Sequence, residues 1–136
     1  LRQKISGLFP SQQRAKINQL RQRILIGGAA TPELKAGYQA SRAVMGDALS
    51  QGFFERRSVH IDYQRGDGVA TQREVEPHYL LLNLPIWYLV GWDHLRQANR
   101  MFRIDRVLDA QVGDTKFQVQ SKRLALAGFE QFFDPV

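Results

Sequence analysis

From Phe53 to Val112 the apolar residues form short segments, alternating or continuous, that turn-forming residues separate. The period is clearest where Val59, Ile61 and Tyr63 alternate with polar neighbours, which is typical of a strand with one buried face. Glycine, asparagine, aspartate and proline mark the turns between segments. Pro77 lies inside the second segment and predicts a bend, a bulge or an edge position, because proline donates no ladder hydrogen bond. The pattern predicts five strands, at about residues 58–63, 71–83, 86–92, 100–104 and 107–112.

The residues before Phe53 follow a helical period instead. One helix is expected to end at Phe9 before Pro10, and a second to run from Ser11 to Ile24. Thr31 and Pro32 then start a third, whose apolar positions continue to Gly52. A terminal helix is expected from Ser121 to Phe133. The predicted class is therefore α+β: a helical connector over residues 1–52, a five-stranded, partly open small barrel of the SH3-like or Sm-like kind over residues 53–113, and a C-terminal helical segment over residues 114–136.

The composition indicates one globular domain with some helical attachment. The chain has 136 residues, of which 43% are hydrophobic and 24% are charged. No apolar run is long enough to span a bilayer, and no signal-peptide pattern follows Leu1. The absence of cysteine fits a reducing compartment. We therefore expect a cytoplasmic protein without a membrane partner, and we interpret the chain as a fragment of a longer one.

The net charge of +6 is unevenly distributed along the chain. Residues 1–52 contain eight basic and two acidic residues, which accounts for the whole excess. Residues 53–113 contain eight arginines and eight acidic residues, and residues 114–136 contain three of each sign. The N-terminal part is thus suited to a polyanion or is simply a solvated helix face. The neutral middle part is suited to a small or short anion in a local pocket.

No motif for catalysis or metal binding competes with a binding function. The three histidines, His60, His78 and His94, are scattered singly, without the short spacing of a zinc site. No serine lies in a Gly-x-Ser-x-Gly turn, so a hydrolase elbow is not supported. We expect a protein that is not an enzyme and that needs no cofactor or metal.

The strand region contains four motifs, which in chain order are Ile61-Asp62-Tyr63, Glu76-Pro77, Trp87-Tyr88-Leu89 and Phe102-Arg103-Ile104-Asp105-Arg106-Val107. Together they resemble the WYL domain, a small sensory β-barrel of bacterial transcription regulators. The resemblance covers about residues 56–113. It implies a helix-turn-helix regulator of the DeoR/YafY-like kind, in which residues 1–52 join the barrel to a DNA-binding domain upstream of Leu1. It also implies a homodimer that contacts DNA through that missing domain.

Arginine and aromatic side chains near these strands are the candidate binding residues. From the residues alone, Arg103 either pairs with Asp105, Glu76 or Asp62 or faces a phosphate, for which a forked guanidinium is well suited. Trp87 is either a core residue or a stacking platform. The resemblance implies an anionic effector derived from nucleic acid, either a nucleotide or a short oligonucleotide. Its expected partners are Arg103, Arg106, Arg73 and Arg100, with Tyr88, Tyr63 and Trp87 as stacking or hydroxyl groups.

Two alternatives to effector sensing stay open at this point. In the first, the barrel and the basic helices together form an accessory module whose function is to bind RNA or DNA. Its affinity would depend steeply on the salt concentration. Otherwise the aromatic strand would be buried against a partner, and the chain would be a dimerisation domain that binds no anion.

Overall fold

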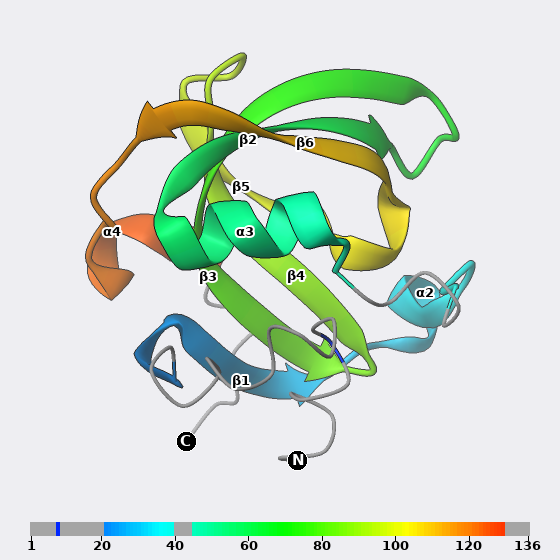
Figure 1. Ribbon diagram of the computed structural model, residues 1–136. Helices are drawn as coiled ribbons and strands as arrows, with labels where there is room; N and C mark the ends of the chain where they lie inside the picture. The colour runs from blue at the N-terminus through cyan, green and yellow to red at the C-terminus, as the bar shows by residue number, and fades with distance from the viewer. Residues whose placement is uncertain (1–7, 9–20, 40–44, 130–136) are drawn as a thin grey trace.

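The computed structural model describes residue 8, residues 21–39 and residues 45–129 (Figure 1). The regular elements are, in chain order, β1 (Ile24–Ala29), α2 (Pro32–Lys35), α3 (Asp47–Glu55), β2 (Arg57–Gln64), β3 (Ala70–Leu84), β4 (Ile86–Asp93), β5 (Ala98–Arg103), the 3-10 helix η3 (Ile104–Arg106), β6 (Val107–Lys116) and α4 (Lys122–Ala125).

Six strands form one sheet in the described part of the chain. Five of them run antiparallel in the order β5-β4-β3-β2-β6, and β1 adds to β3 in parallel. The long strand β3 makes this possible, because residues 70–75 pair with β2 and residues 80–84 pair with β1 along the same edge. The five strands predicted after Phe53 are present. The barrel is not confirmed, because the sheet is open and β5 and β6 lie at its two ends.

The bend expected at Pro77 is a register shift in the pairing of β3 with β4, between Pro77 and Tyr79. Gly91 lies opposite Pro77. A Cβ at Gly91 would lie 2.6 Å from the carbonyl oxygen of Glu76 and 2.6 Å from a methyl group of Val75. Only glycine therefore allows the two strands to approach this closely.

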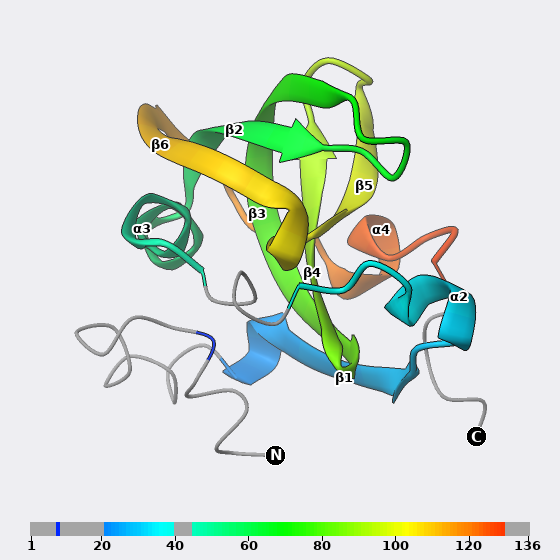
Figure 2. The same ribbon diagram turned by 90° about the vertical axis from the view of Figure 1, so that its right-hand side faces the viewer.

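The sheet separates two apolar clusters (Figure 2). In the larger cluster, Leu49 and Phe53 of α3 pack against one face of the sheet, which includes Trp87 and Leu89. The smaller cluster lies on the other face and includes Tyr88. Apolar residues in and next to α2 and α4 pack against it. The alternation along β4 is as expected. Both aromatic residues are nevertheless buried, because α3 covers one face and the α2 and α4 segments cover the other.

The helical predictions are mostly wrong where the structure describes them. Ile24 begins β1 instead of ending a helix. The Thr31 cap is confirmed, since its hydroxyl accepts a hydrogen bond from the backbone N–H of Leu34 at 3.3 Å. The helix ends at Lys35, however, and α3 begins separately at Asp47. The predicted helix before Pro10, most of the one from Ser11 and the end of the last one lie outside the described residues.

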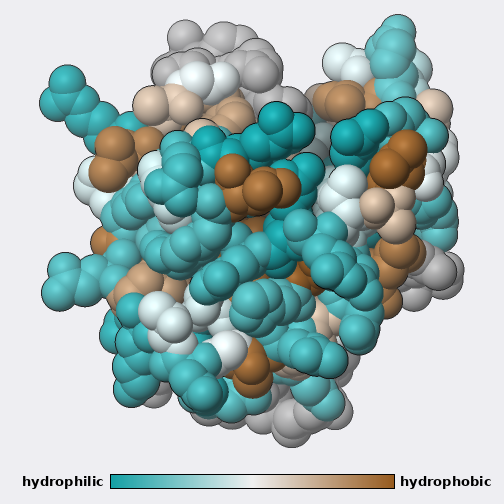
Figure 3. Space-filling view, turned by 90° about the horizontal axis from the view of Figure 1, so that it is seen from above, coloured by the Kyte–Doolittle hydropathy of each residue, from teal (hydrophilic) through white to brown (hydrophobic). Residues whose placement is uncertain are grey.

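The predicted boundary at residues 52 and 53 falls inside α3, which packs into the core of the sheet. The C-terminal helix starts after Ser121 as expected but ends at Ala125. None of the helices in the described ranges combines the length and apolarity needed to cross a bilayer. Figure 3 shows a mainly hydrophilic face with separate apolar spots.

Candidate ligand-binding site

A cavity of about 570 Å³ lies beside β4 and β5 and brings together five of the seven predicted binding residues. These five are Tyr63, Tyr88, Arg100, Arg103 and Arg106. The remaining walls come from β5 itself and from segments distant in the sequence, and consist of Ala98, Asn99, Met101, Glu33, Leu34, Gly128 and Phe129. A volume of this size is suited to a ligand of nucleotide size rather than to a duplex.

Strand pairing positions the centre of the cavity. Tyr88 of β4 lies directly opposite Arg103 of β5, so both side chains emerge on the same face of the sheet. Tyr63 at the end of β2 reaches the same point, where its hydroxyl oxygen accepts a hydrogen bond from the backbone N–H of Arg103 at 2.9 Å. Its ring packs edge-on against Phe102, with the ring centres 5.1 Å apart.

Arg103 is buried and fully engaged by protein groups. Its guanidinium donates two hydrogen bonds to the carboxylate of Asp105, at 3.0 Å and 2.9 Å, and a third to the carbonyl oxygen of Leu34 at 2.8 Å. The side chain of Arg103 is 4% exposed and that of Asp105 is 1% exposed. Asp105 also accepts from the backbone N–H of Gln39 at 3.2 Å. The pair therefore fixes residues 34–39 against the sheet. Of the two alternatives for Arg103, pairing with a carboxylate or facing a phosphate, the structure has the pair with Asp105.

Arg100 and Arg106 are the cations of the cavity that remain accessible. Arg100 is exposed and Arg106 is half-buried, and neither forms an ion pair with a carboxylate among the described residues. Arg106 lies against the turn between β2 and β3, where a Cβ on Gly66 would be 3.4 Å from its guanidinium. Two arginines with unsatisfied charge in one hollow are a suitable arrangement for an anion.

The two tyrosines keep their protons at neutral pH. Burial is the main reason that the pKa of Tyr63 lies above its usual value, and the hydrogen bond from Arg103 and the charge of Arg106 oppose that rise. Burial likewise raises the pKa of Tyr88, against the nearby charge of Arg103. Both residues therefore present neutral phenol rings at the cavity, which can stack or donate a hydrogen bond.

Comparison with known families identifies the part of the chain that holds this cavity. Residues 46–112 match the family model of the WYL domain. This segment is a WYL domain. The match begins at the start of α3 and ends in β6, so the five predicted residues of the cavity all lie within it.

A solved structure that resembles the chain is proteasome accessory factor B/C (PafBC) of Arthrobacter aurescens. The two are 28% identical, with a TM-score of 0.49, over 60% of this chain and 14% of that one. The chain thus corresponds to about one-seventh of that protein's length.

Two of the predicted residues lie away from the cavity of the WYL domain. Arg73 is buried and forms an ion pair with Asp93 at 3.5 Å. It lines a different hollow, on the β2, β3 and β6 side of the sheet, so its predicted convergence with the other arginines is wrong. Trp87 is 5% exposed and belongs to the larger apolar cluster. It is a core residue because α3 covers that face of β4.

The residues that close the cavity of the WYL domain could not be predicted from the sequence. Leu34 and Phe129 are more than 90 residues apart in the chain and meet only because both pack against the outer face of β4. Asn99 is positioned by a hydrogen bond from its amide to the side-chain oxygen of Gln120 at 2.8 Å. Both contacts join residues that are far apart in the sequence, so neither periodicity nor the spacing of motifs predicts them.

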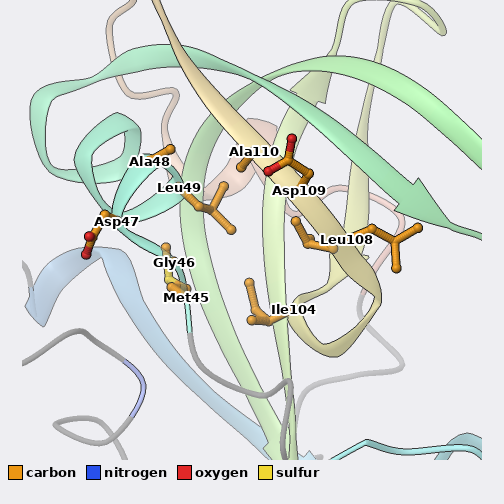
Figure 4. A pocket seen from close by; sticks show the side chains of 10 residues that line it. Met45, Gly46, Asp47, Ala48, Leu49, Ile104, Leu108, Asp109 and Ala110 are labelled. Atoms are coloured by element: carbon orange, nitrogen blue, oxygen red, sulfur yellow. The ribbon is translucent and has the colours of Figure 1, made fainter.

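A second hollow of the WYL domain, of about 440 Å³, lies between the start of α3 and β6 (Figure 4). Its walls are mainly apolar side chains such as Met45, Leu49 and Ile104. The charged residues that line it in the described part of the chain are Asp47 and Asp109, which would repel an anion. No group of three or more histidine or acidic side chains able to hold a metal ion occurs in the described ranges.

Proposed function

We propose that this WYL domain is a ligand-sensing module of a bacterial transcription regulator of the helix-turn-helix, DeoR/YafY-like kind. Its effector is a short oligonucleotide or a nucleotide, bound in the 570 Å³ cavity. The observation that carries the proposal is the presence of Arg100 and Arg106, without carboxylate partners among the described residues, beside Tyr63 and Tyr88. The domain binds and does not catalyse.

The cavity supplies the groups that a nucleotide needs. Arg100 and Arg106 donate to phosphate oxygens, and charge-assisted hydrogen bonds of this kind are about twice as strong as neutral ones. A base stacked on an aromatic side chain gains about 1–3 kcal/mol. Tyr63 and Tyr88 lie close enough to line the same hollow as both arginines. A single phosphate with its attached base therefore fits the arrangement of charges and rings.

Residues 34–39 provide the route by which binding would reach the rest of the regulator. They are held by Arg103 and Asp105, and Leu34 is itself a wall of the cavity. A phosphate near Arg103 would compete with the carbonyl oxygen of Leu34 for its guanidinium. A hydrogen bond to a charged group is worth about 1.5–3 kcal/mol, which is the size of a typical allosteric coupling of about 1–3 kcal/mol. In the full regulator, a homodimer, this segment would transmit the change toward the DNA-binding domains.

The test is fluorescence polarisation of a labelled short single strand titrated with the chain. Arg100→Gln should raise Kd at least about tenfold, since it removes one phosphate contact. Arg96→Gln is the matched control, because Arg96 is exposed in the turn between β4 and β5 and does not line the cavity. Equal Kd values for the two variants would contradict the proposal.

The charge of residues 1–52 supports the nucleic-acid accessory module as a second candidate. The two candidates differ in salt dependence. Two arginine–phosphate contacts predict a slope of log K against log salt of about −1.4 for a single strand, whereas five contacts predict about −3.5. A steep slope that Arg100→Gln leaves unchanged would favour the accessory module.

A further inference from the structure

A second basic cavity lies on a different part of the surface and is lined by residues at the end of α3, before β1 and at the start of α4. Its volume is about 500 Å³, and it shares no residue with the cavity beside β4 and β5. Among the described residues its lining contains three cations and no carboxylate, and consists of Gln22, Arg23, Arg56, Tyr79, Phe117, Gln118, Val119 and Lys122.

Arg23 gives this cavity a fixed positive charge. Its guanidinium donates to three backbone carbonyl oxygens, those of His78 at 2.9 Å, Phe53 at 2.5 Å and Pro77 at 2.6 Å. The carbon of the guanidinium lies 3.9 Å from the centre of the Phe53 ring. Arg23 is 7% exposed, and no carboxylate of the described residues pairs with it. The carbonyl groups that hold this buried cation carry no net charge. They do not neutralise its positive charge, which can therefore attract an anion.

Arg56 adds a second charge from a fixed backbone position. It ends α3 in the left-handed conformation, with φ 55°. Its carbonyl oxygen accepts a hydrogen bond from the backbone N–H of Phe117 at 3.0 Å. Burial, and then repulsion by Arg56, lower the pKa of Arg23 to about 10, so Arg23 is still charged at neutral pH. The side chain of Arg56 is exposed and forms no ion pair within the described residues.

The opposite wall is fixed through Gln120. Its backbone N–H donates to the ring Nδ1 of His78 at 3.2 Å, and its carbonyl oxygen accepts from the hydroxyl of Tyr79. The ring of Phe117 packs edge-on against His78, with centres 4.9 Å apart. These contacts hold the segment that carries Lys122, whose side chain is exposed. The three charges are thus supplied by three separately anchored segments.

We propose that this cavity is a second anion site that takes a phosphate group, either a terminal phosphate or a phosphodiester of a nucleic-acid strand. Arg56 and Lys122 would donate directly to phosphate oxygens. Arg23 would act mainly through its charge, since three of its five N–H donors already bind backbone carbonyl oxygens. Three cations without a carboxylate favour a group with more than one negative oxygen. The site does not depend on the cavity beside β4 and β5 or on its effector.

The experiment is a titration of the ¹⁵N-labelled chain at constant ionic strength, followed by amide chemical shifts. The probes are inorganic phosphate, a dinucleotide with a 5′-phosphate and the same dinucleotide without it. Shifts should appear at Gln22 and at residues 117–122. Response to phosphate and to the 5′-phosphorylated probe alone would assign a terminal phosphate, whereas response to both dinucleotides would assign a phosphodiester.

Two variants test the site without disturbing the fold. Arg56→Gly removes one cation at a position where glycine adopts the left-handed conformation more readily, so the protein should stay folded. Lys122→Gln removes the other, and Arg123→Gln, one residue along on the same exposed helix, is its control. Arg56→Gly and Lys122→Gln should each raise Kd for the probe about tenfold or more, and Arg123→Gln should leave it unchanged. An unchanged Kd in both test variants, or an equal loss in Arg100→Gln, would overturn the proposal.

Discussion

The ion pair of Arg103 with Asp105 should be a major contributor to stability, which a double-mutant cycle can measure. Arg103→Ala removes three hydrogen bonds and leaves the backbone N–H of Gln39 as the one donor to the Asp105 carboxylate among the described residues. Both side chains are almost completely buried. Removing one partner of a buried pair costs about 3–5 kcal/mol, a large part of the 5–15 kcal/mol that stabilises a typical domain.

The double variant Arg103→Ala, Asp105→Ala should lose less than the sum of the two single losses, because neither charge is then left buried alone. We expect a coupling free energy of about 2 kcal/mol. Urea unfolding, followed by the fluorescence of the two tryptophans, Trp87 and Trp92, gives the four free energies of unfolding. A loss below about 1 kcal/mol for Arg103→Ala, as for an exposed pair, would refute the structural role. Additive losses would refute the direct coupling.

Two further predictions concern the interior. Burial, and then the charge of Arg23, lower the pKa of His78 from 6.5 to about 4. The histidine therefore takes up a proton more readily in the unfolded chain than in the folded one. The free energy of unfolding should be at its full value above pH 6.5 and should fall by about 3 kcal/mol in all as the pH falls toward 4. Urea midpoints at pH 7.5 and pH 5 should differ less in His78→Gln than in the wild type, and equal differences would contradict this origin. Gly52→Ala should destabilise the protein by about 1–3 kcal/mol, although helix propensity alone predicts a gain, because the new Cβ would lie 2.9 Å from a methyl group of Val59. A higher thermal midpoint for that variant would show that α3 shifts freely.

The strands after Phe53 could be predicted because their signal is local. Alternating side chains and turn residues lie within a few positions of each other, and both depend on the backbone alone. Strand β1 had no such signal. Its partner is the stretch Leu80–Leu84, more than 50 residues later, and its two glycines, Gly27 and Gly28, are typical of a break between helices rather than of a strand.

The helix predicted from Pro32 to Gly52 shows how a regular period can mislead. Leu34 and Tyr38 pack against the smaller apolar cluster, whereas Met45 and Leu49 belong to the larger one on the other face of the sheet. Their helical spacing therefore arises from two separate packing environments. A sequence pattern reports that residues are buried, but not which face buries them.

The site was predicted in part for similar reasons. Three of its arginines come from one short stretch, and strand pairing brings Tyr88 to Arg103. Arg73, by contrast, forms an ion pair with Asp93. This pairing depends on the strand register set by the bulge after Pro77 and on the turn after β4, so the spacing of charges in the sequence does not predict it. The choice of Asp105 as the partner of Arg103 likewise depends on the turn of η3.

The central claim, that the cavity beside β4 and β5 binds an anionic effector, is tested most directly by mapping a short single strand on the ¹⁵N-labelled chain. The account predicts that the amide signals of Tyr63, Tyr88, Arg100 and Arg106 shift together and saturate at one stoichiometric equivalent. It also predicts that Arg100→Gln weakens these shifts and that Arg96→Gln does not. Shifts confined to residues 1–52, with the four cavity signals unmoved, would contradict it.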